Sequence, residues 1–355
     1  MGEATTRPFG AGVPPLAFAS ADALEVVDMH TAGEPVRIVV GGYPRLEGAT
    51  ILDKRRQALE RHDRLRVAMM HEPRGHAGMY GVIPVAPSLP GADLACLFAH
   101  ASGYSTMCGH ATIAIGRWAV EAGLVRADGD RARFGLELPC GLVEVEAKLE
   151  ADRVVAAAFE SVPAYVDRAD LVLDAPGYGR ALADIVFGGA FYAVLPASRL
   201  GVSFDDGLPA LIGAAKAAFA GARLHEAPQH PEQPDLSFLY GVILIDDAAP
   251  LATTRNLCLF GEGQIDRSPT GSGVTARMAL DLLSGRIGEG VPRRFLGPTG
   301  DGFDATARRV ADYGGRPAAR VRVSGRSFYS GTQRLIVEAD DPLGEGFLLF
   351  ASETA

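Results

Sequence analysis

The sequence predicts an α/β chain made of two similar halves, and three observations lead to this. The length of 355 residues favours two domains over a single compact core. Strand-like apolar runs alternate with helix-like segments along both halves. Two loops that each lead into a helix-like segment have the same form, one with Cys108 and one with Thr270, and each segment meets a glycine fifteen residues on, Gly123 and Gly285. An internal duplication of about half the chain explains the offset of 162 residues between the two loops.

Local patterns predict the elements of the first half. Residues 36–40 are mostly β-branched and lie between a proline and two glycines, which predicts a strand that ends in a turn. Residues 54–70 combine many charges with spaced Leu and Val, which is typical of a surface helix. We expect a buried strand at 94–100, a helix at 111–122 that stops at a glycine, and a half-buried strand at 142–149, where apolar and charged side chains alternate.

The second half repeats this rhythm. Residues 190–195 and 238–245 are apolar and predict strands. Between them, residues 210–220 are rich in alanine and follow Pro209, which suits the start of a helix. Residues 274–283 predict a second helix, which ends at a Ser-Gly pair.

The last part of the chain is expected to add strands and loops. Residues 319–323 and 334–338 predict late strands, and the proline-rich stretches 227–234 and 292–298 predict loops. We place the boundary between the halves near residues 161–163. The expected domains are residues 1–160, completed by about 345–355, and residues 161–344.

Composition and charge exclude some functions. The chain has 48% hydrophobic and 22% charged residues, as ordinary globular proteins do. A formal net charge of −9 and a pI of about 5.4 argue against non-specific binding to nucleic acid or to an anionic membrane. The longest apolar runs are far too short for a membrane span. A small anionic substrate stays open, because backbone dipoles can bind a carboxylate whatever the net charge.

The cysteines indicate a compartment. The chain has four of them, Cys96, Cys108, Cys140 and Cys258, and none forms a C-x-x-C motif. A low, scattered count fits a reducing environment and predicts a cytoplasmic location. The first twenty residues hold only a short apolar stretch. We therefore expect disordered chain or a lead into the first strand there, and rank a secretory signal below both.

Cys108 is the first candidate for chemistry. It lies between a turn rich in small polar residues and the start of a helix, where backbone N–H groups have no partner within the helix. Such a helix end binds anions and favours a thiolate over a thiol. The alternative is a small buried residue without a role, which is what most free cysteines are.

Four neighbours of the two loops are further candidates. His110 either pairs with the thiolate or binds substrate, although a lone histidine is more often a satisfied polar residue. Asp266 either caps its turn or binds a cationic nitrogen. Gly271 and Ser272 have small side chains at the second helix start, which leaves backbone N–H groups free for a carboxylate. This glycine-rich turn lacks the lysine of a P-loop, so nucleotide binding is not expected.

A metal site is not expected. His71 and His76 lie in a segment that contains proline and glycine, without the H-E-x-x-H spacing of a zinc helix. The cysteines other than Cys108 sit in or beside apolar strands and are expected in the core.

Segments 107–110 (MCGH) and 266–273 (DRSPTGSG) resemble the two signature segments of the proline racemase family. Segments 28–35 (DMHTAGEP), 72–76 (EPRGH) and 189–193 (GAFYA) are similar to family segments too. The resemblance covers most of the chain, from about residue 27 to the last strand. It implies the fold of diaminopimelate epimerase, in which two similar α/β halves each wrap a mixed sheet around a central helix, with the active site in the cleft between them. It also implies that no metal or organic cofactor is used.

The family contains proline racemases, 4-hydroxyproline epimerases and trans-3-hydroxy-L-proline dehydratases. The racemases and epimerases have a cysteine in both signatures, one for each face of the α-carbon. Thr270 stands in the second position here, which resembles the dehydratase subgroup. The expected function is therefore cofactor-independent dehydration of trans-3-hydroxy-L-proline. The alternatives are a racemase or hydroxyproline 2-epimerase with one cysteine base, and a non-catalytic imino-acid-binding protein.

Carried over by resemblance, Cys108 is the base that removes the α-proton. Gly109, His110, Gly271 and Ser272 hold the substrate, mostly through backbone N–H groups on its carboxylate. His110 and Asp266 contact the ring nitrogen, and Thr270 lines the far face. The expected partner is a small imino acid, with no nucleic acid or membrane, and a homodimer is left open.

Overall fold

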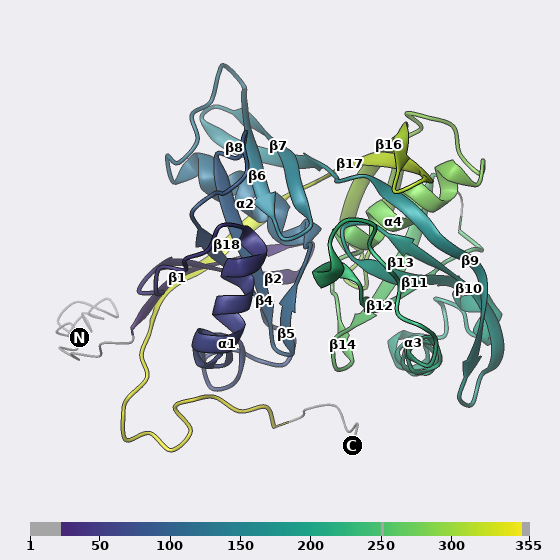
Figure 1. Cartoon of the computed structure of the whole chain (residues 1–355), viewed down its shortest axis with the longest axis horizontal. Helices are drawn as coiled ribbons and strands as arrows, with labels where there is room; N and C mark the ends of the chain where they lie inside the picture. Colours follow the sequence, from purple (N-terminus) through teal and green to yellow (C-terminus); the bar gives the residue numbers. More distant parts are fainter. Residues whose placement is uncertain (1–22, 250–251, 350–355) are drawn as a thin grey trace, which may run out of the picture.

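The computed structural model describes residues 23–249 and 252–349. Two halves lie side by side, and strand β17 runs between them (Figure 1). The first twenty residues, for which the sequence suggests disordered chain or a lead into a strand, lie outside the described residues. No helix in the described ranges has the length and apolar character needed to cross a membrane.

The first half surrounds helix α2. Its elements are β1 (Leu24–Thr31), β2 (Glu34–Gly41), α1 (Ile51–Met70), β3 (Tyr80–Val85), β4 (Leu94–His100), β5 (Gly103–Ser105), α2 (Gly109–Glu121), β6 (Arg131–Leu138), β7 (Gly141–Glu150), β8 (Arg153–Glu160) and, from the end of the chain, β18 (Ser327–Leu335).

The second half surrounds helix α4. Its elements are β9 (Ala164–Ala175), β10 (Gly179–Phe187), β11 (Phe191–Pro196), η1 (Ala197–Leu200), α3 (Leu208–Arg223), η2 (Pro234–Leu236), β12 (Leu239–Ile245), β13 (Thr253–Phe260), β14 (Gln264–Ile265), α4 (Gly271–Leu283), β15 (Arg293–Leu296), β16 (Gly302–Tyr313) and β17 (Arg316–Gly325).

The order of strand pairing is the same in both halves. Within the described ranges the first half pairs β18–β1–β2–β3–β4–β6–β7–β8, and the second pairs β9–β10–β11–β12–β13–β15–β16–β17. The parallel pairs β2–β3 and β4–β6 occupy the same places as β11–β12 and β13–β15. Helices α1 and α3 connect equivalent strands, as do α2 and α4. The predicted duplication and the predicted fold class are therefore confirmed.

Strands β8, β9 and β17 join the halves. Strand β17 pairs with β8 of the first half and with β9 of the second. The chain passes from β8 to β9 through residues 161–163 and returns to the first half to form β18, which is the antiparallel neighbour of β1. Further on, Phe347 makes an isolated bridge with Glu72, so the chain stays on the first half.

Most predicted elements are present, with small shifts. Helices α2 and α4 begin at Gly109 and Gly271, a few residues before the expected 111 and 274. The stretch 292–298 was expected to be a loop, but it contains β15, whose backbone pairs with β13 and β16. The strand expected at 334–338 ends at Leu335.

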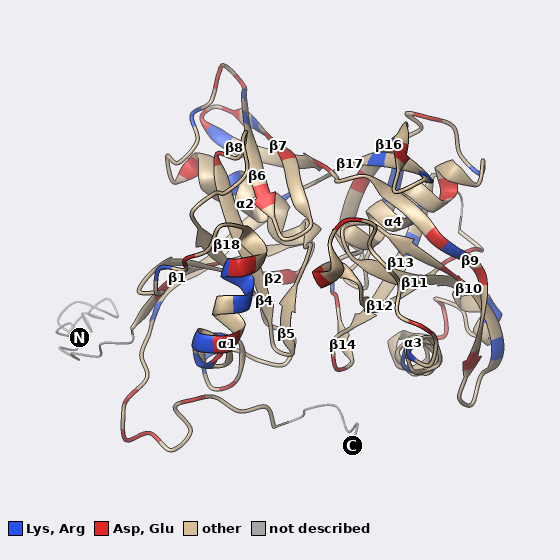
Figure 2. Cartoon of the chain, in the orientation of Figure 1, with Lys and Arg blue, Asp and Glu red and all other residues tan. Residues whose placement is uncertain are grey.

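The two central helices are buried almost entirely. Residues 271–282 of α4 are all buried, and α2 is buried through Arg117. A helix that is buried on nearly every side fits only the inside of a fold. Both helices are followed by a glycine with positive φ, Gly123 at +76° and Gly285 at +75°, which confirms the two stop signals. Charged residues of both signs are found in the outer loops and in α1 (Figure 2).

Candidate active site

The two central helices meet start to start. A Cβ atom added to Gly109 would lie 2.4 Å from Cα of Gly271, so only glycine allows the backbones to approach this closely. Cys108 is the N-cap of α2, and Thr270 is the N-cap of α4. The two residues therefore hold equivalent places, as the sequence predicted. The N–H groups of both first turns converge on one region, which favours an anion there.

A small cavity lies where the helices meet. All seven residues predicted for the site line it, and both halves contribute. The lining residues are Tyr80, Met107, Cys108, Gly109, His110, Tyr192, Tyr240, Phe260, Asp266, Thr270, Gly271 and Ser272. The sequence motifs thus come together at one place in the fold, although a role for each residue stays a prediction.

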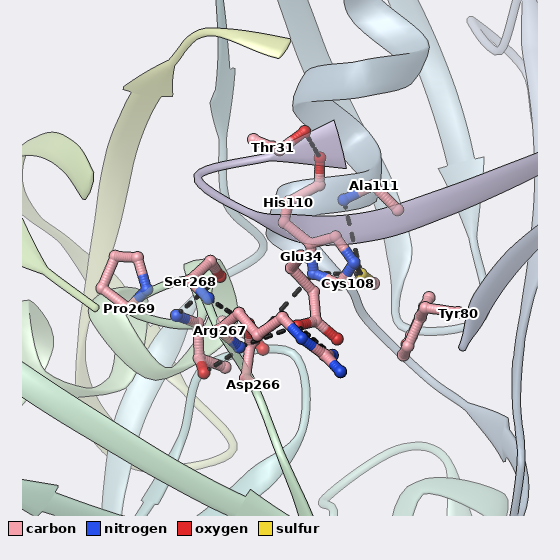
Figure 3. A network of polar contacts seen from close by, with 12 residues as sticks. Thr31, Glu34, Tyr80, Cys108, His110, Ala111, Asp266, Arg267, Ser268 and Pro269 are labelled. Atoms are coloured by element: carbon pink, nitrogen blue, oxygen red, sulfur yellow. Dashed lines mark hydrogen bonds and ion pairs between the residues drawn. The ribbon is translucent and has the colours of Figure 1, made fainter. Parts of the chain in front are cut away.

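Cys108 and His110 form a close pair at the start of α2. Nδ1 of His110 lies 3.1 Å from Sγ of Cys108, and the backbone N–H of Ala111 points at the same sulfur from 3.4 Å (Figure 3). Both side chains are buried. Burial lowers the pKa of His110, which keeps the imidazole neutral near pH 7.

The pKa of the Cys108 thiol differs from the expectation. Burial raises it well above its usual value, and the carboxylates of Asp266 and Glu34 raise it further. The Ala111 N–H and the Tyr80 hydroxyl act in the opposite direction. The expected effect of the helix start is therefore present, but desolvation outweighs it.

Asp266 organises the second loop. Its Oδ1 accepts the backbone N–H of Ser268 at 2.7 Å, and its Oδ2 accepts the hydroxyl of Thr270 at 2.8 Å. The same Oδ2 lies 3.9 Å from Nδ1 of His110. Both roles considered from sequence, capping the turn and facing a cation, are thus compatible with its position. Ser272 is held by Tyr192, whose hydroxyl lies 2.7 Å from Oγ of Ser272.

Glu34 and Arg267 are site residues that sequence reasoning missed. Glu34, at the start of β2, is 1% exposed and accepts the Arg267 backbone N–H at 2.7 Å and its guanidinium at 3.2 Å. This pair joins the halves beside Asp266. Burial raises the pKa of Glu34 well above its usual value. Both residues stood in the quoted motifs, but nothing local to either signals a contact across 233 residues.

Aromatic residues that the sequence did not single out form one wall of the cavity. Tyr240 and Phe260 stack with ring centroids 5.4 Å apart, and Tyr80 lies edge-on to His110 at 4.8 Å. These residues belong to strands β12, β13 and β3. Apolar rings exclude water from a small site and leave polar tips available for specific contacts.

The other candidates lie away from the cavity. No cluster of His, Cys, Asp and Glu suited to a metal ion occurs in the described ranges. His71 ends α1 and its Nε2 lies 2.8 Å from the carbonyl oxygen of Ala101. Cys96 and Cys258 are buried as expected, whereas Cys140 is only partly buried.

Comparison with known proteins agrees with this geometry. Residues 26–348 match the family model described as proline racemase. The chain is 46% identical over 334 residues to trans-3-hydroxy-L-proline dehydratase of Homo sapiens, covering 92% of this chain and 94% of the relative. It is 38% identical to the protein of the same name from Colwellia psychrerythraea, over 91% and 92% of the two chains.

Solved structures show the same fold. A probable proline racemase from Agrobacterium radiobacter, with bound carbonate, is 25% identical with a TM-score of 0.86, over 92% of this chain and 97% of that chain. A hydroxyproline epimerase from Agrobacterium vitis, with bound trans-4-hydroxy-L-proline, is 24% identical with a TM-score of 0.88, over 93% and 95%. Because the family model matches residues 26–348, the chain belongs to the proline racemase family.

Proposed function

We propose that this protein dehydrates trans-3-hydroxy-L-proline to Δ1-pyrroline-2-carboxylate without a cofactor. The observation that carries the proposal is the asymmetry of the two helix starts: the N-cap residue is a cysteine in α2 and a threonine in α4. A thiolate can remove a proton near neutral pH, whereas a threonine hydroxyl has no acid–base use there. Relatives at 46% identity that carry the dehydratase name support the same assignment.

The cavity suits a cyclic amino acid. In the proposed complex the carboxylate lies on the N–H groups of Gly109, His110, Gly271 and Ser272, where the two helix starts favour an anion. The protonated ring nitrogen faces Asp266 and His110. This cation offsets the Asp266 charge, which raises the pKa of Cys108 in the free protein, so substrate binding favours the thiolate.

The elimination balances without a co-reactant. The Cys108 thiolate takes the proton from C2, the electron pair of that bond forms the C2=C3 double bond, and the C3–O bond breaks. The hydroxide takes up one proton on the same face and leaves as water, and the proton gained by Cys108 balances this uptake, so that the thiolate is restored. The enamine then tautomerises to the cyclic imine. Dipoles at both helix starts stabilise the negative charge that develops on the carboxylate side.

Stereochemistry explains why one acid–base face is enough. In trans-3-hydroxy-L-proline the hydroxyl is opposite the carboxylate and therefore on the same ring face as the C2 proton. A proton taken by Cys108 is thus on the face from which hydroxide departs. Racemisation differs, because it requires delivery of a proton from the other face, where Thr270 stands.

Incubation with 3-hydroxyproline and 4-hydroxyproline, each with a ketimine trap, tests this proposal. Trapped imine from the 3-hydroxy substrate alone is expected. Epimerisation of the 4-hydroxy substrate without imine formation would support the one-base epimerase, and no turnover of either would support a binding protein. We also propose a cytoplasmic location, since the four cysteines are free. A homodimer, which the family resemblance left open, is tested by light scattering of the purified protein.

A further inference from the structure

Dehydration needs a proton for the departing hydroxide, and this proton must be available on the Cys108 side of the ring. His110 and Asp266 face the ring nitrogen in the proposed complex. Nδ1 of His110 lies 3.9 Å from Oδ2 of Asp266. The Thr270 hydroxyl is already donated to Asp266 and belongs to the other helix start. The Cys108 thiol, which has taken the C2 proton on that face, is one candidate donor, and the cavity wall holds a second.

Tyr80 has the position that this role requires. Its ring lies edge-on to His110 with centroids 4.8 Å apart, and its side chain lines the same cavity as Cys108. In Figure 3, Tyr80 and Asp266 lie on opposite sides of Cys108. Since the ring nitrogen and C3 are the two ring neighbours of C2, a nitrogen that faces Asp266 directs C3 towards Tyr80.

The hydroxyl of Tyr80 is held and kept protonated. It forms a hydrogen bond with Oγ of Ser105, and Tyr80 is 2% exposed. Burial and the neighbouring Cys108 raise the pKa of Tyr80 well above its usual value, so it remains a donor near neutral pH. A hydrogen bond from Tyr80 also lowers the pKa of the Cys108 thiol, which links the two groups directly.

We propose that Tyr80 is a second catalytic residue, which gives its phenolic proton to the C3 hydroxyl as the C3–O bond breaks. This rests on the proposed dehydratase function. The C2 proton moves to Cys108, the Tyr80 proton leaves with hydroxide as water, and the phenolate takes the proton from the Cys108 thiol. Thiolate and phenol are restored, and one water molecule is lost from the substrate, so the protons balance.

The Tyr80→Phe variant distinguishes two roles of the hydroxyl: proton donation to the C3 hydroxyl and stabilisation of the Cys108 thiolate. The variant keeps the ring and removes only the hydroxyl. The reaction is run in D₂O with trans-3-hydroxy-L-proline, and the remaining substrate is recovered for mass spectrometry. A missing acid leaves a carbanion that Cys108 re-protonates with deuterium. We expect turnover to fall about 10²- to 10⁴-fold. The amount of deuterium at C2 of the recovered substrate, divided by the amount of product formed, should rise.

Matched variants make the result specific. Tyr43→Phe also removes a buried tyrosine hydroxyl from the first half, but Tyr43 lies against His62 and does not line the cavity, so its turnover should equal that of wild type. Ser105→Ala keeps the phenol of Tyr80 and removes its hydrogen-bond partner. We expect a smaller fall in turnover, with the same rise in deuterium exchange at C2. Binding of pyrrole-2-carboxylate reports whether the cavity of each variant is intact.

Every outcome decides the proposal. Unchanged turnover in Tyr80→Phe overturns it. If turnover and deuterium exchange at C2 fall together, Tyr80 acts only on the Cys108 thiol, and the proposal is also overturned. If wild-type protein forms no imine, the proposed function fails instead, whatever the variant does.

Discussion

The hydroxyl of Thr270 donates a 2.8 Å hydrogen bond to Oδ2 of Asp266, the same oxygen that lies 3.9 Å from Nδ1 of His110. Thr270 therefore holds the carboxylate that faces the proposed site of the substrate ring nitrogen. In the proposed complex it also lines the substrate face opposite Cys108. Its backbone has φ of +64°, which is unfavourable for a β-branched residue, so the contact to Asp266 helps to keep this conformation.

Thr270→Cys should restore a base on the second face, because both N-caps have equivalent places. We expect some conversion of L-proline to D-proline that carries deuterium at C2 in D₂O. The gain should be small, because a base must be placed within a fraction of an ångström and the variant also loses the contact to Asp266. Thr270→Ser, which keeps a hydroxyl, is the control and should give no D-proline. A Cys variant without D-proline would show that residue 270 alone does not separate the two activities.

Cys108→Ser should lower turnover of trans-3-hydroxy-L-proline by at least about 10²- to 10⁴-fold, because serine is a far poorer base than a thiolate near neutral pH. Folding should be retained, since serine is smaller and still lies beside His110. Initial rates and circular dichroism measure the two effects. Cys96→Ser replaces another buried cysteine outside the cavity lining and should keep turnover. Comparable turnover of the Cys108 variant and wild type would move the base to another residue.

Alkylation of the free protein by iodoacetamide should be slow at pH 7 and should accelerate as pH rises. Burial raises the pKa of Cys108, so the thiolate fraction grows only above the ordinary range near pH 8.5. The same raised pKa contributes stability that is present below the ordinary pKa and is lost as pH rises through the folded-state value. Mass spectrometry locates the label, and substrate should protect. Rapid labelling of Cys108 at pH 6 would contradict the direction of this shift.

Asp266→Asn should weaken binding of pyrrole-2-carboxylate, a flat analogue that keeps the carboxylate and the ring N–H. The amide retains an oxygen for the Ser268 N–H but loses the charge that attracts the ring N–H. Calorimetric titration should show about a tenfold or greater loss, equivalent to about 1.4 kcal/mol. Asp246→Asn alters another buried aspartate that caps a turn, through Ala248 and Ala249, and should leave affinity unchanged. Equal affinities of the Asp266 variant and wild type would remove Asp266 from nitrogen binding.

The sequence allowed the duplication and the two matching loops to be predicted because their signals are local. A turn of small residues, a helix start and a glycine stop occur within about twenty residues, and both copies carry them. The family resemblance supplied the central place of the two helices and the cleft between the halves. Strands such as β9, β10 and β16 were not predicted, because their pairing partners, and not their own composition, define them.

Long-range properties could not be predicted in the same way. β15 lies in a proline-rich stretch, yet pairing with β13 and β16 makes it a strand. The contact between Glu34 and Arg267 and the place of Tyr80 beside His110 depend on how the halves close. The pKa of Cys108 was expected to fall from a local argument about helix ends. It rises because the whole fold buries the thiol.

The central claim is that chemistry occurs on one face of the substrate only. Parallel incubations of one enzyme preparation with trans-3-hydroxy-L-proline and with L-proline, both in EDTA, test it most directly. We predict that the first incubation forms imine, which is detected by trapping. We predict that the second forms no D-proline after long incubation, as measured by chiral chromatography. Clear formation of D-proline, or dehydration that disappears with EDTA and returns with a divalent ion, would contradict the account.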